Sequence, residues 1–250
     1  MQKTLEQAVC AEICSSNGVK ASEIASRLGV DRKSVNQVIY RSPLLQELCY
    51  QDRNYRWHGI VKQGRPHSGL LEFSGYYGLA ADFLSLSEAD FMEKLTEGCR
   101  NIGRSLSDTR GLLHSFRDSR EVVAALFDDL CSMLGDLCLS WEIVFELRLK
   151  RARHVRIYAD ILIITENRVF SLEFKMKDRL DPSEIEQAAK YVPYLEILFG
   201  PAYEIIPVLV LTGASDLFSF ESIGGRDMVL AVASGDALFN VFDEYLSFLS

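Results

Sequence analysis

The chain has 250 residues and a mass of 28.2 kDa, with 48% hydrophobic and 25% charged residues. This composition is typical of a globular protein and excludes a disordered or collagen-like chain. The net charge of −8 argues against a surface covered in basic patches. No run of about 18 apolar residues is present, and the first 18 residues lack the pattern of a secretory signal, so we expect neither a membrane span nor export.

The charge is distributed unevenly along the chain. Residues 1–64 hold nine Lys and Arg against six Asp and Glu, and residues 136–180 hold nine against seven. Residues 181–250 hold only two against eleven. The two basic segments are therefore where we expect a polyanion such as nucleic acid to bind.

The six cysteines form no CxxC pair. We interpret them as reduced and mostly buried thiols of a cytoplasmic protein. A zinc site built on Cys10 and Cys14 is disfavoured because no histidine lies nearby.

The first sixty residues predict three short helices followed by a hairpin. The helices are expected at 4–15, 21–28 and 32–41, the last capped by Asp31, and the strands at about 46–50 and 54–58. This order resembles a winged helix-turn-helix domain spanning 1–60. We expect it to contact DNA phosphates and base edges through polar residues of the third helix and the hairpin, namely Arg32, Lys33, Asn36, Gln37, Arg41 and Arg53. Docking to another protein is the alternative.

The rest of the chain predicts a connector at 61–118 and an α/β domain at 119–250. Residues 59–80 are expected to be a linker with little regular structure, followed by helices from Ser85 or Ser87 to about 100, at 107–117 and at 119–137. Strands are expected at 141–149, 155–164, 168–177, 204–212 and 227–233. Further helices are expected at 181–199, 215–221 and 236–249. The first of these has Asp181 as N-cap, Pro182 at its first position and Glu184 completing a capping box.

The turn between the strands at 155–164 and 168–177 fixes their register. If Glu166 and Asn167 form its centre, Asp160 lies opposite Glu173, with about 5 Å between the Cβ atoms, and Lys175 shares their face. Two opposed carboxylates repel each other, and a divalent cation such as Mg²⁺ would relieve that repulsion. The alternative is a solvated hairpin face on which Lys175 pairs with one of the two acids.

Asp160, the sequence Glu173-Phe174-Lys175 on the next strand and the helix that follows resemble the PD-(D/E)xK restriction-endonuclease-like superfamily. The resemblance implies an α/β fold with an αβββαβ core, in which helices flank a mixed central sheet. It implies that Asp160 and Glu173 bind Mg²⁺ (or Mn²⁺) and that Lys175 assists the hydrolytic water. It also implies that Gln187, with Tyr191 one turn later, lies near the metal or the phosphate.

Two further groups of residues belong to this prediction. The family places another acid on the preceding helix, where Glu121, Asp128 and Asp129 are candidates. Glu146 on the first strand is an alternative, and we take Glu121 as the third metal ligand. Arg151 and Arg153, in the basic run between the first two strands, are expected to follow a phosphate backbone, unless that run is only a solvated hairpin tip.

These features together predict a Mg²⁺-dependent DNA endonuclease that leaves a 5′-phosphate and is targeted by the winged helix. The resemblance suggests a homodimer, and we expect no membrane association and no small-molecule cofactor. The main alternative is a non-catalytic DNA-binding regulator or an assembly factor that keeps the nuclease-like fold as a scaffold. A protein-docking subunit of a larger complex is a third, weaker alternative.

Overall fold

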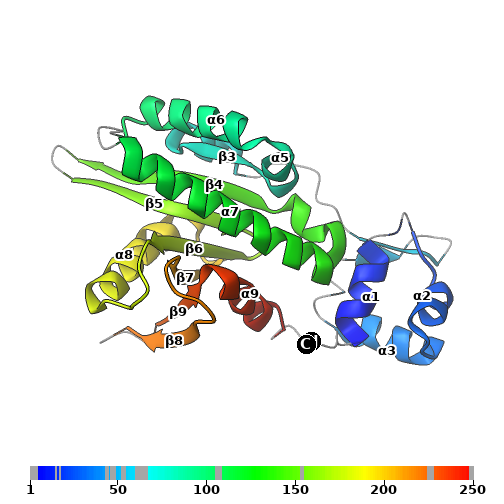
Figure 1. Ribbon diagram of the computed structural model, residues 1–250. Coiled ribbons are helices and arrows are strands. Elements are labelled where there is room, and N and C mark those ends of the chain that lie inside the picture. The colour runs from blue at the N-terminus through cyan, green and yellow to red at the C-terminus, as the bar shows by residue number, and fades with distance from the viewer. Residues whose placement is uncertain are drawn as a thin grey trace. The chain divides into compact units, whose positions relative to one another are not determined.

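The structure, a computed structural model, describes residues 5–14, 16, 18–42, 45, 49–51, 55–59, 67–104, 109–152, 155–223 and 228–247. The chain folds into two compact units (Figure 1). The smaller unit comprises Met1–Gly64, Leu126–Ser140 and Phe242–Ser250, and the larger comprises Arg65–Ala125 and Trp141–Val241. Both the predicted connector and the predicted α/β domain therefore contribute to the larger unit.

The smaller unit begins with three helices: α1 (Leu5–Cys14), α2 (Ala21–Leu28) and α3 (Arg32–Arg41). Gly29 ends α2 in the left-handed conformation, with φ 67°, and the Asp31 side chain accepts a hydrogen bond from the Ser34 N–H to cap α3. A two-stranded antiparallel hairpin follows, formed by β1 (Cys49–Gln51) and β2 (Trp57–Gly59). Val19 bridges Trp57 and so attaches the segment before α2 to this hairpin.

The larger unit is built on a seven-stranded mixed sheet in the order β3-β4-β5-β6-β7-β9-β8. β4, β5 and β6 pair antiparallel, whereas β6, β7 and β9 run parallel. The strands are β3 (Tyr76–Leu79), β4 (Glu142–Ala152), β5 (Val155–Ile164), β6 (Arg168–Lys175), β7 (Glu204–Leu211), β8 (Phe218–Ser222) and β9 (Val229–Ser234). The remaining helices are α5 (Ala80–Ser85), α6 (Glu88–Asn101), α7 (Thr109–Leu134), α8 (Pro182–Phe199) and α9 (Leu238–Ser247), with 3₁₀ turns η1 (Ser68–Phe73), η2 (Gly135–Ser140) and η3 (Gly235–Ala237).

Three sequence predictions of the elements were wrong. Residues 76–79 were expected to lie in a linker, but they form β3, which pairs with β4 at one edge of the sheet. The two helices expected at 107–117 and 119–137 are one continuous helix, α7. Residues 218–222 form the opposite edge strand β8, whereas the sequence predicts a short helix near 215–221. Edge strands depend on pairing with distant residues, which local periodicity does not report.

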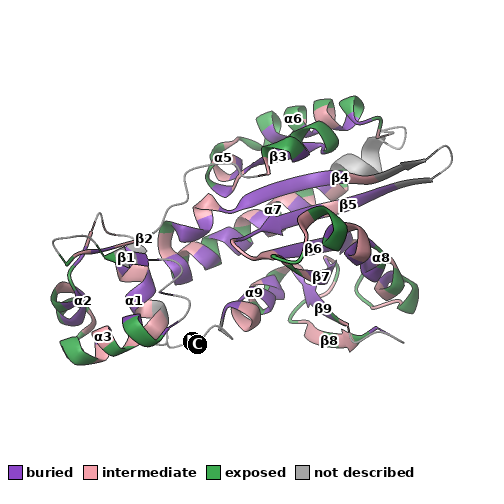
Figure 2. Cartoon of the chain, turned by 180° about the vertical axis from the view of Figure 1, so that it is seen from behind, coloured by how far each residue is buried: buried purple, intermediate pink, exposed green. Residues whose placement is uncertain are grey.

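Helices cover both faces of the sheet. The part of α7 within the larger unit runs along one face, and α8 lies along the other (Figures 1 and 2). The central strands are buried on both faces, and their sequences are almost continuously apolar for that reason (Figure 2). Polar side chains buried on these strands are therefore exceptional. In the described part of the chain, no helix has the length and apolar content needed to span a bilayer.

Candidate active site

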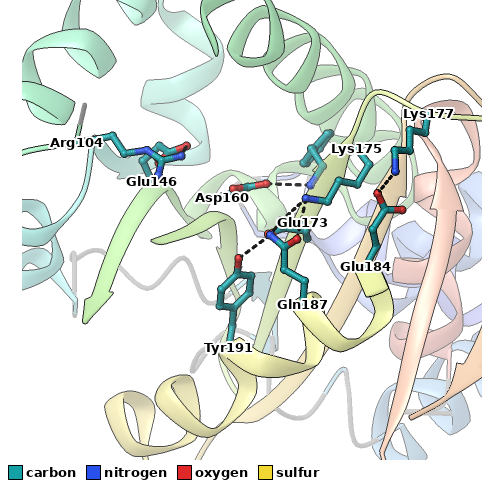
Figure 3. A network of polar contacts seen from close by, with 10 residues as sticks. Arg104, Glu146, Asp160, Glu173, Lys175, Lys177, Glu184, Gln187 and Tyr191 are labelled. Carbon is teal, nitrogen blue, oxygen red and sulfur yellow. Dashed lines mark hydrogen bonds and ion pairs between the residues drawn. The ribbon is translucent and has the colours of Figure 1, made fainter. Parts of the chain in front are cut away.

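The β5–β6 hairpin has the register that the turn residues predict. The Thr165 N–H donates to the Arg168 carbonyl oxygen at 2.9 Å, and the paired residues run from Ile164 with Val169 to Ile161 with Leu172. The next pair along would be Asp160 with Glu173. At that point the Phe174 N–H donates to Oδ2 of Asp160 at 3.1 Å (Figure 3). A side-chain carboxylate thus accepts a hydrogen bond from the main chain of the neighbouring strand.

Asp160 and Glu173 form a close pair of acids, of which Asp160 is half-buried and Glu173 is buried. Glu173 is only 2% exposed. Burial, together with repulsion from Asp160, raises the pKa of Glu173 to about 7, although Lys175 opposes the shift. Burial also raises the pKa of Asp160, despite the hydrogen bond from Phe174 and the nearby positive charge of Lys175. The fold therefore keeps two carboxyl groups together although ionising both is costly.

Lys175 and Gln187 both contact Glu173 (Figure 3). Lys175 Nζ donates to Glu173 Oε1 at 2.8 Å and to Gln187 Oε1 at 3.2 Å. Gln187 Nε2 donates to the same Glu173 oxygen at 2.6 Å and to the Tyr191 hydroxyl at 3.2 Å. Lys175 keeps 21% of its side chain exposed. The predicted residues Asp160, Glu173, Lys175 and Gln187 are thus brought into one cluster.

Helix α8 positions Gln187 through a well-defined first turn. Asp181 caps the helix by accepting from the Ser183 N–H at 2.9 Å, and Pro182 follows. The predicted capping box is absent, because the Glu184 side chain instead pairs with Lys177 at 2.6 Å. Gln187 and Tyr191 are four residues apart and lie on the same helical face, towards β6 (Figure 3).

The third acid comes from a strand and not from a helix. Glu121 is exposed on α7, which covers the opposite face of the sheet, and no described contact connects it with Asp160 or Glu173. The third acid near the pair is Glu146 of β4. Phe145 pairs with Ile161 and Leu147 with Ala159, so Glu146 lies across from Asp160 in the register of β4 and β5. Three neighbouring strands thus each contribute one acid.

Glu146 has an unusual backbone conformation, and its side chain pairs with Arg104. Its backbone is left-handed, with φ 56°, which is costly for a residue with a Cβ atom. Its side chain is 3% exposed and forms an ion pair with Arg104, with Nε and Oε2 2.8 Å apart. Burial and repulsion from Asp160 raise the pKa of Glu146 to about 8, while Arg104 opposes the shift. Neither the strained backbone nor the role of Arg104 is evident from the sequence.

The donor set fits a magnesium ion. Mg²⁺ is usually held by one or two carboxylates, and water and substrate phosphate complete its coordination. Asp160 and Glu173 would supply those carboxylates, and Glu173 Oε2 is buried with no hydrogen-bond partner in the described part of the structure. Among the described residues, no group of three or more His, Cys, Asp or Glu side chains is arranged to hold a metal. The geometry therefore suits a two-carboxylate site better than a closed cage.

The predicted nucleic-acid-binding residues are only partly described. Arg32, Lys33, Gln37 and Arg41 are exposed on α3, and Asn36 is half-buried. Gln37 and Arg41 also line a shallow depression of about 370 Å³ beside Leu5 and Glu6 of α1. Arg53 and Arg153 lie outside the described residues, as does the side chain of Arg151.

Comparison with known proteins adds little. No protein-family model matches the chain, and no curated protein matches it. A solved structure, the crystal structure of protein VC1899 from Vibrio cholerae, is similar over 98% of this chain and 50% of that one, with 11% sequence identity and a TM-score of 0.28. The chain thus spans half the length of that protein. Likeness at this level carries no conclusion about fold or function.

Proposed function

We propose that the protein is a Mg²⁺-dependent phosphodiesterase that cleaves DNA. The observation that carries this proposal is the close pair of half-buried Asp160 and buried Glu173, with Lys175 bound to Glu173 at the edge of solvent. Two acids whose ionisation is mutually unfavourable gain most from a bound dication. The arrangement is consistent with the PD-(D/E)xK fold that the motif resembles.

Each residue has a role that follows from its contacts. When bound between Asp160 and Glu173, Mg²⁺ would polarise a phosphoryl oxygen and favour deprotonation of a water molecule. The Phe174 N–H fixes the orientation of the Asp160 carboxylate. Gln187 orients Glu173 and also accepts a hydrogen bond from Lys175. Lys175, the half-exposed cation of the cluster, orients the attacking water and stabilises charge that develops on the phosphate.

In this proposal, the smaller unit binds DNA through its first sixty residues. Its order of helices and hairpin, with Val19 bridged to Trp57, is that expected of a winged helix-turn-helix domain. Arg32, Lys33 and Gln37 are exposed on α3 and are free to meet phosphates and base edges. In this proposal the winged helix binds the duplex and the larger unit cleaves it.

The test is cleavage of plasmid and single-stranded DNA with and without Mg²⁺. Wild type should cleave only with the metal, and Lys175→Ala should lose at least about a hundredfold in rate, in line with losses on removing a charge-stabilising group. Lys190→Ala, which removes an exposed lysine of α8, is the matched control and should keep full activity. Equal absence of cleavage by wild type and Lys175→Ala, with both Mg²⁺ and Mn²⁺, would contradict the proposal.

A second candidate is a DNA-binding regulator that keeps the nuclease-like unit as a scaffold. It is favoured by the observation that no cluster of three metal-binding side chains occurs among the described residues. This function requires DNA affinity that is unaffected by Mg²⁺ and by Asp160→Asn. The nuclease instead requires Mg²⁺ binding, measured by isothermal titration calorimetry, that Asp160→Asn removes.

A further inference from the structure

The structure places a second cation beside the carboxylates that no motif predicts. Arg104 follows α6, and its guanidinium pairs with Glu146, next to Asp160 (Figure 3). Lys175 lies on the other side of Asp160 from Arg104 (Figure 3). Asp160 therefore lies between Lys175 on one side and Arg104 on the other.

Several contacts fix the position of Arg104. Gly103, left-handed with φ 71°, ends the α6 segment, and the Arg104 N–H donates back to the Cys99 carbonyl oxygen at 2.9 Å. Arg148 holds the same turn by donating from Nη1 to the Ile102 carbonyl oxygen at 2.7 Å. The Arg104 guanidinium carbon lies 4.5 Å from the centre of the Tyr158 ring. The guanidinium is thus oriented by a backbone turn, an aromatic face and a carboxylate.

Two glycines, Gly75 and Gly98, allow α6 to approach the sheet closely. A Cβ atom on Gly98 would overlap the Gly75 carbonyl oxygen, and a Cβ atom on Gly75 would lie 3.2 Å from the Glu146 Cβ. The Gly75 N–H donates to the carbonyl oxygens of Phe145 and Glu146, at 2.9 and 3.3 Å. Two glycines therefore let the end of α6 reach the strand that carries Glu146.

Arg104 and Glu146 differ in how far their side chains are exposed to solvent. Glu146 is 3% exposed at its side chain, whereas Arg104 is 29% exposed. The described contacts of the guanidinium with Glu146 involve Nε and Nη2. A guanidinium carries five N–H donors in a planar fork that matches phosphate oxygens, so donors remain for a ligand at the open face.

We propose that Arg104 binds a phosphate group of the nucleic-acid substrate beside the cleavage site, and that Glu146 is the positioning residue that holds Arg104 there. This rests on the proposed function, because it assigns a substrate contact to the same site. It assigns Glu146 to the arginine and leaves Mg²⁺ to Asp160 and Glu173. A phosphodiester would then meet Lys175 and Arg104 on the two sides of Asp160.

The test measures binding without turnover. A fluorescein-labelled 12-nucleotide oligothymidylate is titrated with the full chain in Ca²⁺, and anisotropy is followed between 50 and 200 mM salt. All proteins carry Arg32→Ala and Lys33→Ala so that DNA binding by the smaller unit does not mask the effect.

Arg104→Ala should weaken oligonucleotide binding about tenfold. The slope of log affinity against log salt concentration should fall by about 0.7, the value for one phosphate contact on a single strand. Arg104→Lys should recover the slope but only part of the affinity. Arg100→Ala, an exposed arginine of α6, is the matched control.

Glu146→Gln separates positioning from metal binding. It should weaken oligonucleotide binding, have no further effect in the Arg104→Ala background, and leave Mg²⁺ affinity unchanged in calorimetry. Unchanged affinity and slope in Arg104→Ala would overturn the assignment. So would a Glu146→Gln protein that loses tenfold or more in Mg²⁺ affinity and binds the oligonucleotide normally, since Glu146 would then be a metal ligand. Failure of the wild type to cleave DNA would instead overturn only the proposed function, because these measurements require no turnover.

Discussion

Replacing Glu173 with glutamine should stabilise the protein at pH 8 in the absence of metal. The pKa of Glu173 is raised from 4.5 to about 7, mainly by burial and by repulsion from Asp160. Ionising this carboxyl group in the folded state therefore costs about 3 kcal/mol more than in the unfolded chain. Glutamine has a similar shape and no proton to lose, and its amide oxygen can still accept from Lys175 and Gln187.

The sign of the pH dependence follows from proton binding. Between pH 4.5 and about 7 the folded state holds the Glu173 proton that the unfolded state has released. The stability that this proton contributes is fully present below pH 4.5 and is lost as pH rises through about 7. The advantage of Glu173→Gln should therefore be small near pH 4.5 and reach at most about 3 kcal/mol at pH 8. Asp160 and Glu146 also repel the Glu173 charge, so removing that charge relieves part of the cost of ionising all three carboxyl groups.

The assay is urea denaturation in EDTA at pH 5 and pH 8, followed for the larger unit by near-ultraviolet circular dichroism. Glu186→Gln, an exposed acid of α8, is the matched control and should show no pH-dependent gain. Millimolar Mg²⁺ should reverse the order by stabilising wild type and not Glu173→Gln, because only the wild type keeps both carboxylates. A Glu173→Gln protein that is less stable than wild type at pH 8 in EDTA would refute the reasoning. The hydrogen bonds at Glu173 would then outweigh the cost of its charge.

Three further predictions concern other parts of the larger unit. Glu142→Gln should reduce stability at pH values above 4.5, and this loss should disappear as pH falls through the lowered pKa of Glu142. Burial raises that pKa, but the hydrogen bonds from His67 and Tyr77 outweigh burial and lower it; urea denaturation from pH 3 to 7 measures the effect. Gly98→Ala should lower the free energy of unfolding by about 3 kcal/mol or more, because the new Cβ atom would overlap Gly75. Gly103 is left-handed but faces open space, so Gly103→Ala should lower it by only about 1 kcal/mol. Thermal denaturation compares the two variants. Gln187→Ala should lower kcat for DNA cleavage by about tenfold to a hundredfold, because Glu173 loses the hydrogen bond that orients it. The Mg²⁺ concentration that gives the half-maximal rate should rise for the same reason. An unchanged Mg²⁺ dependence would contradict this prediction.

The candidate site was predictable from sequence where it depends on local geometry. A tight turn at Glu166 and Asn167 fixes the hairpin register, and strand alternation then places Lys175 on the face of Asp160 and Glu173. The capping residues of α8 likewise fix the direction in which Gln187 points. Each inference spans fewer than about thirty residues and needs only the periods of strands and helices.

The contribution of Arg104 was not predictable in this way. Arg104 reaches Glu146 because two glycines, Gly75 and Gly98, let α6 approach the sheet. The two glycines are far apart in sequence and meet only through tertiary packing, which local patterns do not report. The position of Glu121 relative to the acid pair was not predictable for a related reason: helical periodicity shows which residues share a face but not which face of the sheet the helix covers. The left-handed backbone at Glu146 is likewise imposed by its surroundings, since no local preference favours it in glutamate.

Two glutamates of β4 show how a carboxylate whose charge is satisfied within the fold differs from one whose charge is not. Glu142 and Glu146 lie on the same strand and are both 3% exposed. Glu142 accepts from the His67 N–H and the Tyr77 hydroxyl and pairs with His67 Nδ1, so its negative charge is satisfied within the fold. Glu146 faces another acid and has one cation, and its pKa rises to about 8 whereas that of Glu142 falls. Asp160 and Glu173 are under-satisfied in the same sense, and above the raised pKa of Glu173 a cation from outside the chain would relieve the cost of their charges. By this criterion, a bound cation would stabilise the row of acids across β4, β5 and β6 most, and a phosphate would bind there with it. Glu142 needs neither, because its charge is already satisfied.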